Sequence, residues 1–137
     1  MNEMIELHDS KLVAVSWADG VAVVMLSPAI VHRSEGRPGV DAGTVWWQAA
    51  MFTFRTPLIS AHGELPVPVR SGSLHIGDEE HNNMIPATGV FTAAIKLNLD
   101  LTDRDHLIVT ADQLLISLTG DAHQEGKFEP ASKSSHQ

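Results

Sequence analysis

The sequence predicts an all-β domain, an antiparallel sandwich or partly open barrel of about eight short strands. Three observations support this fold class. Short runs of β-branched and apolar residues recur along the chain, Gly, Pro and Asp residues separate them, and no long stretch has the period of an amphipathic helix. The 137 residues are enough for one domain, which we expect to span residues 1–129.

The first predicted unit is a hairpin. Two β-branched runs flank Asp19-Gly20, and glycine supplies the positive φ that a tight turn needs. Pro28 should interrupt the ladder, so residues 29–33 are expected to form a separate short strand. The Gly- and Pro-rich segment 34–43 then predicts a surface loop.

The middle of the chain predicts two further strands. Residues 45–54 are aromatic-rich and lack the acidic residue of a helix capping box, which favours a strand over a short helix. The three prolines of residues 57–68 predict an irregular connection. Residues 69–76 should form a strand that bulges at Gly72, followed by a polar tip over residues 77–83.

The last third predicts a meander. Apolar and polar residues alternate over residues 90–99, as in a strand with one buried face. A turn at 111–113 should separate two further strands, 106–110 and 114–119. The composition then becomes polar, and we expect residues 130–137 to be a disordered tail.

Composition excludes several function classes. The 17 acidic and 9 basic side chains give a net charge of −8, which disfavours a nucleic-acid partner. No apolar run is long enough for a membrane span. The acidic N-terminal segment and the absence of cysteine predict a cytoplasmic protein without disulfide bonds.

Common catalytic signatures are absent from the sequence. It contains no dinucleotide-binding glycine motif, no phosphate-binding loop, no nucleophile elbow and no His-Glu-x-x-His motif. We therefore expect no cofactor and lean against an enzyme, although a missing motif does not exclude one.

Histidine and carboxylate residues offer the one metal-capable chemistry. His75 and His81 lie close in sequence to Glu79 and Glu80, but the spacing is loose and no His-x-His pair occurs. We favour a solvated hairpin tip here and keep His75 and His81 as candidate metal ligands.

Two other segments supply candidate ligand or interface residues. His8 and Asp9 precede the first hairpin, where an imidazole–carboxylate pair could move a proton, or where Asp9 and Ser10 could bind backbone groups. The second set could line a small-ligand or peptide pocket if the 34–43 loop folds back. It comprises His32, Arg33, Glu35, Trp46 and Trp47.

The tryptophan pair also has a simpler interpretation. Adjacent residues of a strand face opposite ways, so one of Trp46 and Trp47 would fill the core while the other shields a sheet edge or a dimer contact.

Three short strings along the chain carry a resemblance. The strings Glu6-Leu7-His8-Asp9-Ser10, Val31-His32-Arg33-Ser34 and the closing Leu118-Thr119-Gly120-Asp121-Ala122 resemble uncharacterised bacterial β-rich proteins that open with Leu-His-Asp-Ser and end in a Gly-Asp/Glu-Ala hairpin. The resemblance implies a small bacterial cytoplasmic protein and carries over no catalytic residue. The opening is also similar to that of some immunity-type proteins, which would bind a basic toxin.

These observations favour a non-enzymatic β domain that works by binding, either to itself as a homo-oligomer or to a protein partner. The alternative is a small-ligand or metal-binding protein, possibly an enzyme, that uses its histidines.

Overall fold

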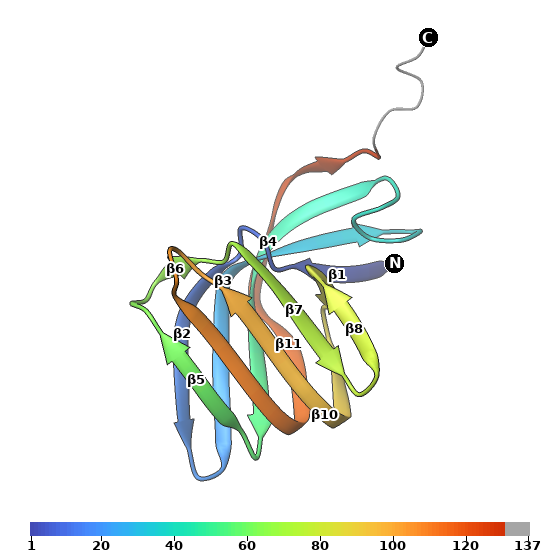
Figure 1. Ribbon diagram of the computed structural model, residues 1–137. Coiled ribbons are helices and arrows are strands. Elements are labelled where there is room, and N and C mark those ends of the chain that lie inside the picture. Colours follow the sequence, from blue (N-terminus) through green and yellow to red (C-terminus); the bar gives the residue numbers. More distant parts are fainter. Residues whose placement is uncertain (131–137) are drawn as a thin grey trace.

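The computed structural model describes residues 1–130 and confirms the predicted fold class. An antiparallel sheet curls into a half-barrel around one interior (Figure 1). The strands are β1 (Asn2–Glu6), β2 (Lys11–Ala18), β3 (Val21–Ser34), β4 (Gly43–Arg55), β5 (Leu58–His62), β6 (Val67–Pro68), β7 (Ser71–Ile76), β8 (Glu79–Asn82), β9 (Met84–Pro86), β10 (Gly89–Asp100) and β11 (His106–Phe128).

Hydrogen bonding orders the main path of the sheet as β6-β2-β3-β4-β11-β10-β7-β8. Strand β1 pairs with β3 and β9, and β5 pairs with the first part of β11. The far halves of β3, β4 and β11 extend beyond the half-barrel together with β1 (Figure 1).

The predicted hairpin is confirmed. Asp19 and Gly20 connect β2 to β3 with φ values of 53° and 77°. Two successive positive φ values match the twist of the flanking strands, which is why glycine suits the second position.

The predicted interruption of the ladder at Pro28 is confirmed, whereas the prediction of a separate short strand over residues 29–33 is wrong. Strand β3 runs through Pro28, and the register with β4 shifts between Leu26 and Ala29. An irregularity of this kind accommodates a proline because the bulged residue makes no ladder hydrogen bond.

The predicted turn at residues 111–113 is also wrong. One continuous strand, β11, spans His106–Phe128 and bends instead of turning. At this point it exchanges its partner β5 for β4, while β10 stays paired to its other side. Ala111 is 7% exposed, so this position packs inward. At Gly120 the strand likewise continues, through register shifts, and forms no hairpin.

Two segments that were predicted to lack strands, the irregular connection at 57–68 and the polar tip at 77–83, contain strands. Within residues 57–68, β5 pairs with β11 and β6 pairs with β2. The expected polar tip at 77–83 contracts to a turn at Gly77 and Asp78, since β8 continues the hairpin with β7. The three prolines of the first segment and the polar residues of the second hide any strand pattern, so only tertiary pairing defines these strands.

The interior confirms the alternation predicted for β10. Ile95, Leu97 and Leu99 are buried, whereas the residues between them are more exposed. They pack with the inward residues of β3, β4 and β11, including the fully buried Phe52 and Phe54. Burying each such side chain contributes about 1.5–3 kcal/mol, which makes this interior the main source of stability.

The side of strands β2, β3, β4, β11 and β10 that points away from the interior forms a surface that we call the outer face. Strand register places its residues in cross-strand rows, such as Ser16–Val23–Thr53–Leu115–Val90. The residues of the outer face are Ala14, Ser16, Ala18, Val21, Val23, Met25, Met51, Thr53, Arg55, Val90, Thr92, Gln113, Leu115 and Ser117.

The loop predicted over residues 34–43 is confirmed, because residues 35–42 connect β3 to β4. Pro38 is buried, and a Cβ added to Gly39 would meet the Cε atom of Met84 at 2.6 Å. The loop therefore folds back against β9.

Strand β11 ends at Phe128, and most of the expected tail, residues 131–137, lies outside the described residues. No helix in residues 1–130 has the length and apolarity needed to cross a membrane.

Candidate functional site

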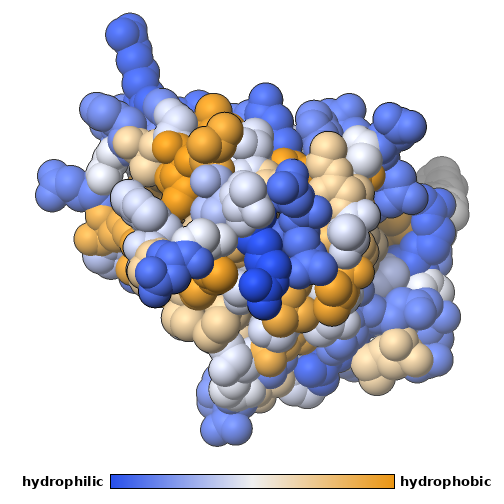
Figure 2. All heavy atoms as spheres, turned by 90° about the horizontal axis from the view of Figure 1, so that it is seen from below, coloured by the Kyte–Doolittle hydropathy of each residue, from blue (hydrophilic) through white to orange (hydrophobic). Residues whose placement is uncertain are grey.

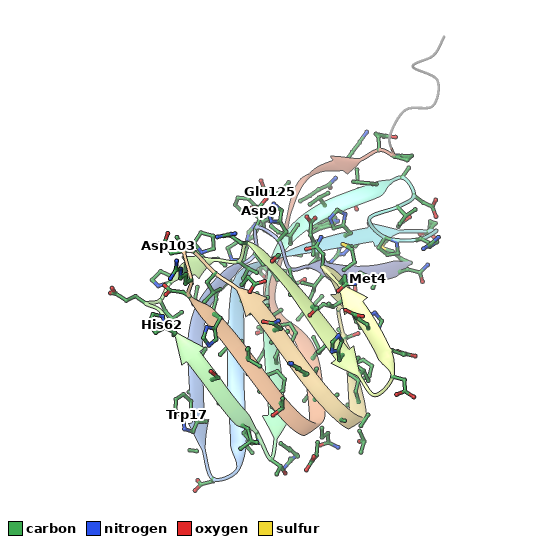
Figure 3. All side chains as sticks on the ribbon, in the orientation of Figure 1. Met4, Asp9, Trp17, His62, Asp103 and Glu125 are labelled. Atoms are coloured by element: carbon green, nitrogen blue, oxygen red, sulfur yellow. The ribbon has the colours of Figure 1, made fainter. Side chains whose placement is uncertain are left out.

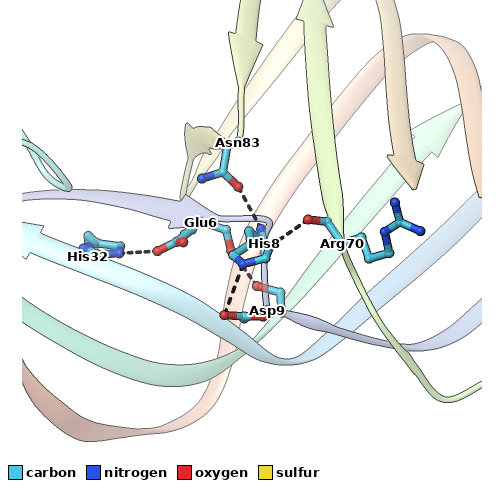
Figure 4. Close-up of polar contacts among 7 residues, drawn as sticks. Glu6, His8, Asp9, His32, Arg70 and Asn83 are labelled. Carbon is cyan, nitrogen blue, oxygen red and sulfur yellow. Dashed lines mark hydrogen bonds and ion pairs between the residues drawn. The ribbon is translucent and has the colours of Figure 1, made fainter. Parts of the chain in front are cut away.

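A partly buried polar pair joins β1 to β3. The Nε2 atom of His32 lies 2.7 Å from Oε1 of Glu6 (Figure 4). His32 is only 5% exposed, and the ring of Phe128 packs against it edge-on at 5.5 Å. The hydrogen bond from His32 holds the pKa of Glu6 below its usual 4.5, and the positive charges of His32 and His8 act in the same direction, although burial raises it.

The imidazole of His32 is closed to a substrate, whereas the side chain of Glu6 is 25% exposed. The carboxylate of Glu6 occupies Nε2 of His32, and Nδ1 is buried without a hydrogen-bond partner among residues 1–130. A general base must reach the proton that it removes. In this arrangement the Glu6–His32 hydrogen bond links β1 to β3.

Ser10 connects the same two strands, β1 and β3, through its hydroxyl group. Its buried hydroxyl donates to the carbonyl oxygen of Glu6 at 2.6 Å and accepts from the amide of Ile30 at 3.0 Å. Ser10 thus performs the backbone-binding role that the sequence suggested for short polar residues at this strand entry.

His8 and Asp9 lie in the turn after β1, where Asp9 has a φ of 71°. Nδ1 of His8 is 2.6 Å from the carbonyl oxygen of Arg70, so Nδ1 carries the proton and donates. Nε2 is 3.5 Å from the Asp9 carboxylate, and Asn83 accepts from the His8 amide (Figure 4). Both side chains are exposed, and the contacts anchor the turn to the strand entry at Arg70.

Arg33 and Trp46 do come together. The Arg33 guanidinium lies 4.3 Å from the centre of the Trp46 ring, and its Nε donates to Glu3 at 2.8 Å. The indole nitrogen of Trp46 donates to the hydroxyl of Thr44 at 2.7 Å. Such a cation–π contact contributes about 0.5–1 kcal/mol at a partly exposed site.

Glu35 is exposed at the start of the loop. With Arg33, Thr44 and Met1 it lines a shallow depression of about 230 Å³. His32 is separated from this depression, because consecutive residues of β3 point to opposite faces.

The two tryptophans also face opposite ways. Trp46 packs against the core, whereas Trp47 is 44% exposed. Trp47 borders a hollow of about 290 Å³ with Pro28, Ala49 and His123, on the side of the sheet that carries the outer face. The residues predicted to line one pocket are thus divided between the two sides of the sheet.

The candidate metal ligands lie in the β7–β8 hairpin. Nε2 of His75 is 3.2 Å from Glu80, and Nε2 of His81 is 3.4 Å from Glu79. His75 is paired with Glu80 and His81 with Leu74, so the two imidazoles lie on opposite faces. Within residues 1–130, no three His, Asp or Glu side chains are arranged to hold a metal ion.

Two features had no signal in the sequence. His62 of β5 and His106 of β11 form a cross-strand pair with rings stacked 6.4 Å apart, and each contacts one further polar residue, Asp105 and Ser60 respectively. The exposed edges of β2 and β5 lie near this pair at one margin of the molecule (Figure 3). Both features depend on strand pairings that no local pattern predicts.

Comparison with protein-family models, with curated proteins and with solved structures found no match.

Proposed function

We propose that this protein is a non-enzymatic binding domain that self-associates through the outer face. The observation that carries the proposal is the row Val90–Leu115–Thr53–Val23–Ser16, which crosses five strands without a charge. Leu115 is 42% exposed and Val90 is 65% exposed. An uncharged surface that exposes large apolar side chains, here interspersed with the hydroxyl residues Ser16 and Thr53, is typical of an interface.

Charge supports a second copy as the partner. The chain carries a net charge of −8, yet the residues of the outer face include no Asp or Glu, and Arg55 is their one charged member. Two copies repel each other least when they meet through such a surface.

The size of the surface also fits a dimer. Five strands about 4.8 Å apart and roughly nine residues of β4 at 3.3 Å, from Arg55 to Trp47, give about 600–700 Å² of sheet. A stable dimer buries about 800 Å² on each partner. The outer face alone falls short of this area, and the adjacent hollow at Trp47, which includes one acidic residue, Asp121, extends it toward the area that a stable dimer needs.

The geometry of the contact follows from the fold. Two sheets pack face to face about 10 Å apart with strands inclined by about 30°. In a two-fold dimer the same surface is used twice, so Leu115, near the centre of the outer face, would contact its counterpart or an adjacent row.

The substitution Leu115→Lys tests this proposal by sedimentation equilibrium. Burying two unpaired ammonium groups should raise the dimer dissociation constant by at least about 100-fold. Leu58→Lys is the matched control, because Leu58 is 77% exposed on β5 and lies outside the outer face. Equal effects of the two substitutions, or none, would contradict the proposal.

One observation favours the alternative of a small-ligand site. A groove of about 550 Å³ lies over β5, β11, β10 and β7, with His75 and Lys96 beside the apolar Leu58 and Ile95. That volume is in the range of ligand pockets. Elemental analysis of the purified protein and of His75→Ala tests its metal-binding form, which requires stoichiometric metal that the substitution removes.

A bacterial cytoplasmic setting belongs to the same proposal. The absence of cysteine supports it, since oxidising compartments favour disulfide-stabilised small domains. Cell fractionation tests it directly, and recovery outside the cytoplasm would contradict it.

A further inference from the structure

Two strand edges remain unpaired at one margin of the sheet. Strand β2 pairs with β3 along its length but with β6 only at Lys11 and Leu12, which leaves the edge of residues 13–18 free within the described chain. Strand β5 pairs there with β11 alone. We call the space between these two edges the seam; β2 and β5 lie beside each other at the left of Figure 1.

The seam contains an apolar crevice of about 80 Å³. Trp17 is 64% exposed and Leu65 is 41% exposed beside it, so two large apolar side chains lie at its mouth. Val15, Trp17, His62 and Leu65 are among the residues that line the crevice. Figure 3 shows Trp17 on β2 and His62 on β5 at this margin.

The free edge of β2 lacks the usual protection against pairing. Natural sheets block their edges with charged side chains, prolines or a covering segment. Residues 13–18 contain no charge and no proline, and β6 covers the edge only above them. Their unpaired N–H and C=O groups are therefore available to another strand.

We propose that the seam binds an extended segment of a partner polypeptide, which adds to β2 as a strand. Main-chain hydrogen bonds to residues 13–18 would supply affinity, and alternate apolar side chains of the segment would cover Trp17 and Val15. Asp19 directly follows the free edge of β2, and Glu64 lies between two residues that line the crevice, Gly63 and Leu65. The bound segment therefore carries basic residues at its ends.

The chain's own C-terminal segment does not fit this description. Residues 131–137 read Ala-Ser-Lys-Ser-Ser-His-Gln and contain no large apolar side chain. The free edge of β2 includes Ala14, Ser16 and Ala18 at the margin of the outer face, but the crevice lies on the other side of the strand, where Val15 and Trp17 point. The inference therefore does not depend on the proposed dimer.

The probe for this inference is the peptide Lys-Val-Thr-Val-Thr-Val-Lys with blocked ends. Its control is the same peptide with proline in place of the central valine, which cannot continue a ladder. In a protein carrying Trp46→Phe and Trp47→Phe, Trp17 is the one fluorophore, and we expect the probe to shift its emission to the blue. Hydrogen exchange of the unmodified protein should show new protection at residues 13–18.

Two substitutions locate the binding. Trp17→Ala should raise the dissociation constant of the probe peptide about tenfold or more. Trp47→Ala, which lies away from the seam, should leave that constant unchanged. Equal binding of the proline peptide, or exchange protection elsewhere than β2, would overturn the inference. So would a fall in the mass of the free oligomer on Trp17→Ala, because a second copy would then occupy the seam. Leu115→Lys distinguishes the two proposals, because it should abolish the dimer while the protein still binds the probe peptide.

Discussion

Leu115 of β11 lies directly opposite Val90 of β10, and both point away from the interior. Their 42% and 65% exposure places a branched apolar pair on the solvent side of a sheet whose other side already forms a complete core. Figure 2 shows, from the hairpin end of the molecule, that apolar residues reach the surface in several patches. A surface of this kind is the basis of the predictions on association.

Salt should strengthen self-association. The net charge of −8 opposes the approach of two copies through an uncharged face, and added salt screens that repulsion. Sedimentation at about 20 mM and about 500 mM NaCl should therefore show more dimer at high salt. Weaker association at high salt would instead indicate attraction between opposite charges on the two copies and would contradict association through the uncharged outer face.

The Glu6–His32 pair should make stability depend on pH. Because the folded pKa of Glu6 is held below 4.5, the pair stabilises the protein fully above that pH, and its contribution falls as the pH drops through the folded pKa. Glu6→Gln should lower the free energy of unfolding by about 1–3 kcal/mol at pH 7.

Urea unfolding of both proteins between pH 7 and pH 3 checks this prediction. The difference in the free energy of unfolding between the unsubstituted protein and Glu6→Gln should shrink toward pH 3, because Glu6 becomes protonated in the unsubstituted protein. A difference that is constant with pH would show that the carboxylate charge contributes nothing.

Ser10→Ala should destabilise the junction of β1, β2 and β3. It leaves the amide of Ile30 and the carbonyl of Glu6 without the partner that they have now, at a cost of about 1–3 kcal/mol. Ser16→Ala, on the outer face, is the control and should change stability by less than about 0.5 kcal/mol. Differential scanning calorimetry measures both, and equal melting temperatures would contradict the prediction.

Gly72→Ala should destabilise the protein because β7 lies tightly against its neighbours. An added Cβ would be 2.9 Å from methyl groups of Leu7 and Leu99 and 3.0 Å from the carbonyl oxygen of Asn98. We expect a loss of about 1–3 kcal/mol. Gly126→Ala has open space around its Cβ and should be close to neutral. Chemical denaturation compares the two, and similar midpoints would refute the packing argument.

Local patterns predicted the fold class and its clearest elements. Asp19-Gly20 specifies a hairpin through its backbone geometry, and alternation in β10 reflects one buried face. The division of β11 at residues 111–113 failed because Asp112 resembles a turn residue, whereas pairing with β10 and β4 keeps the chain extended. Turn propensity is local, and here tertiary pairing overrides it.

The sequence predicted individual candidate residues but not which of them lie together in the structure. Adjacent positions on a strand separate His32 from Arg33 and Trp46 from Trp47, so alternation alone argued against one pocket. Glu3 and Glu6, which bind Arg33 and His32, gave no signal because β1 and β3 are distant in sequence. The seam likewise depends on which edges the final pairing leaves free.

The most direct test of the outer face is an isotope-filtered NOE experiment on a mixture of ¹³C-labelled and unlabelled copies. Contacts between copies should appear at methyl groups of Leu115, Val23 and Met51, and they should vanish in Leu115→Lys. An absence of such contacts at concentrations where the dimer is populated, or their appearance at Leu58 instead, would contradict self-association through this surface.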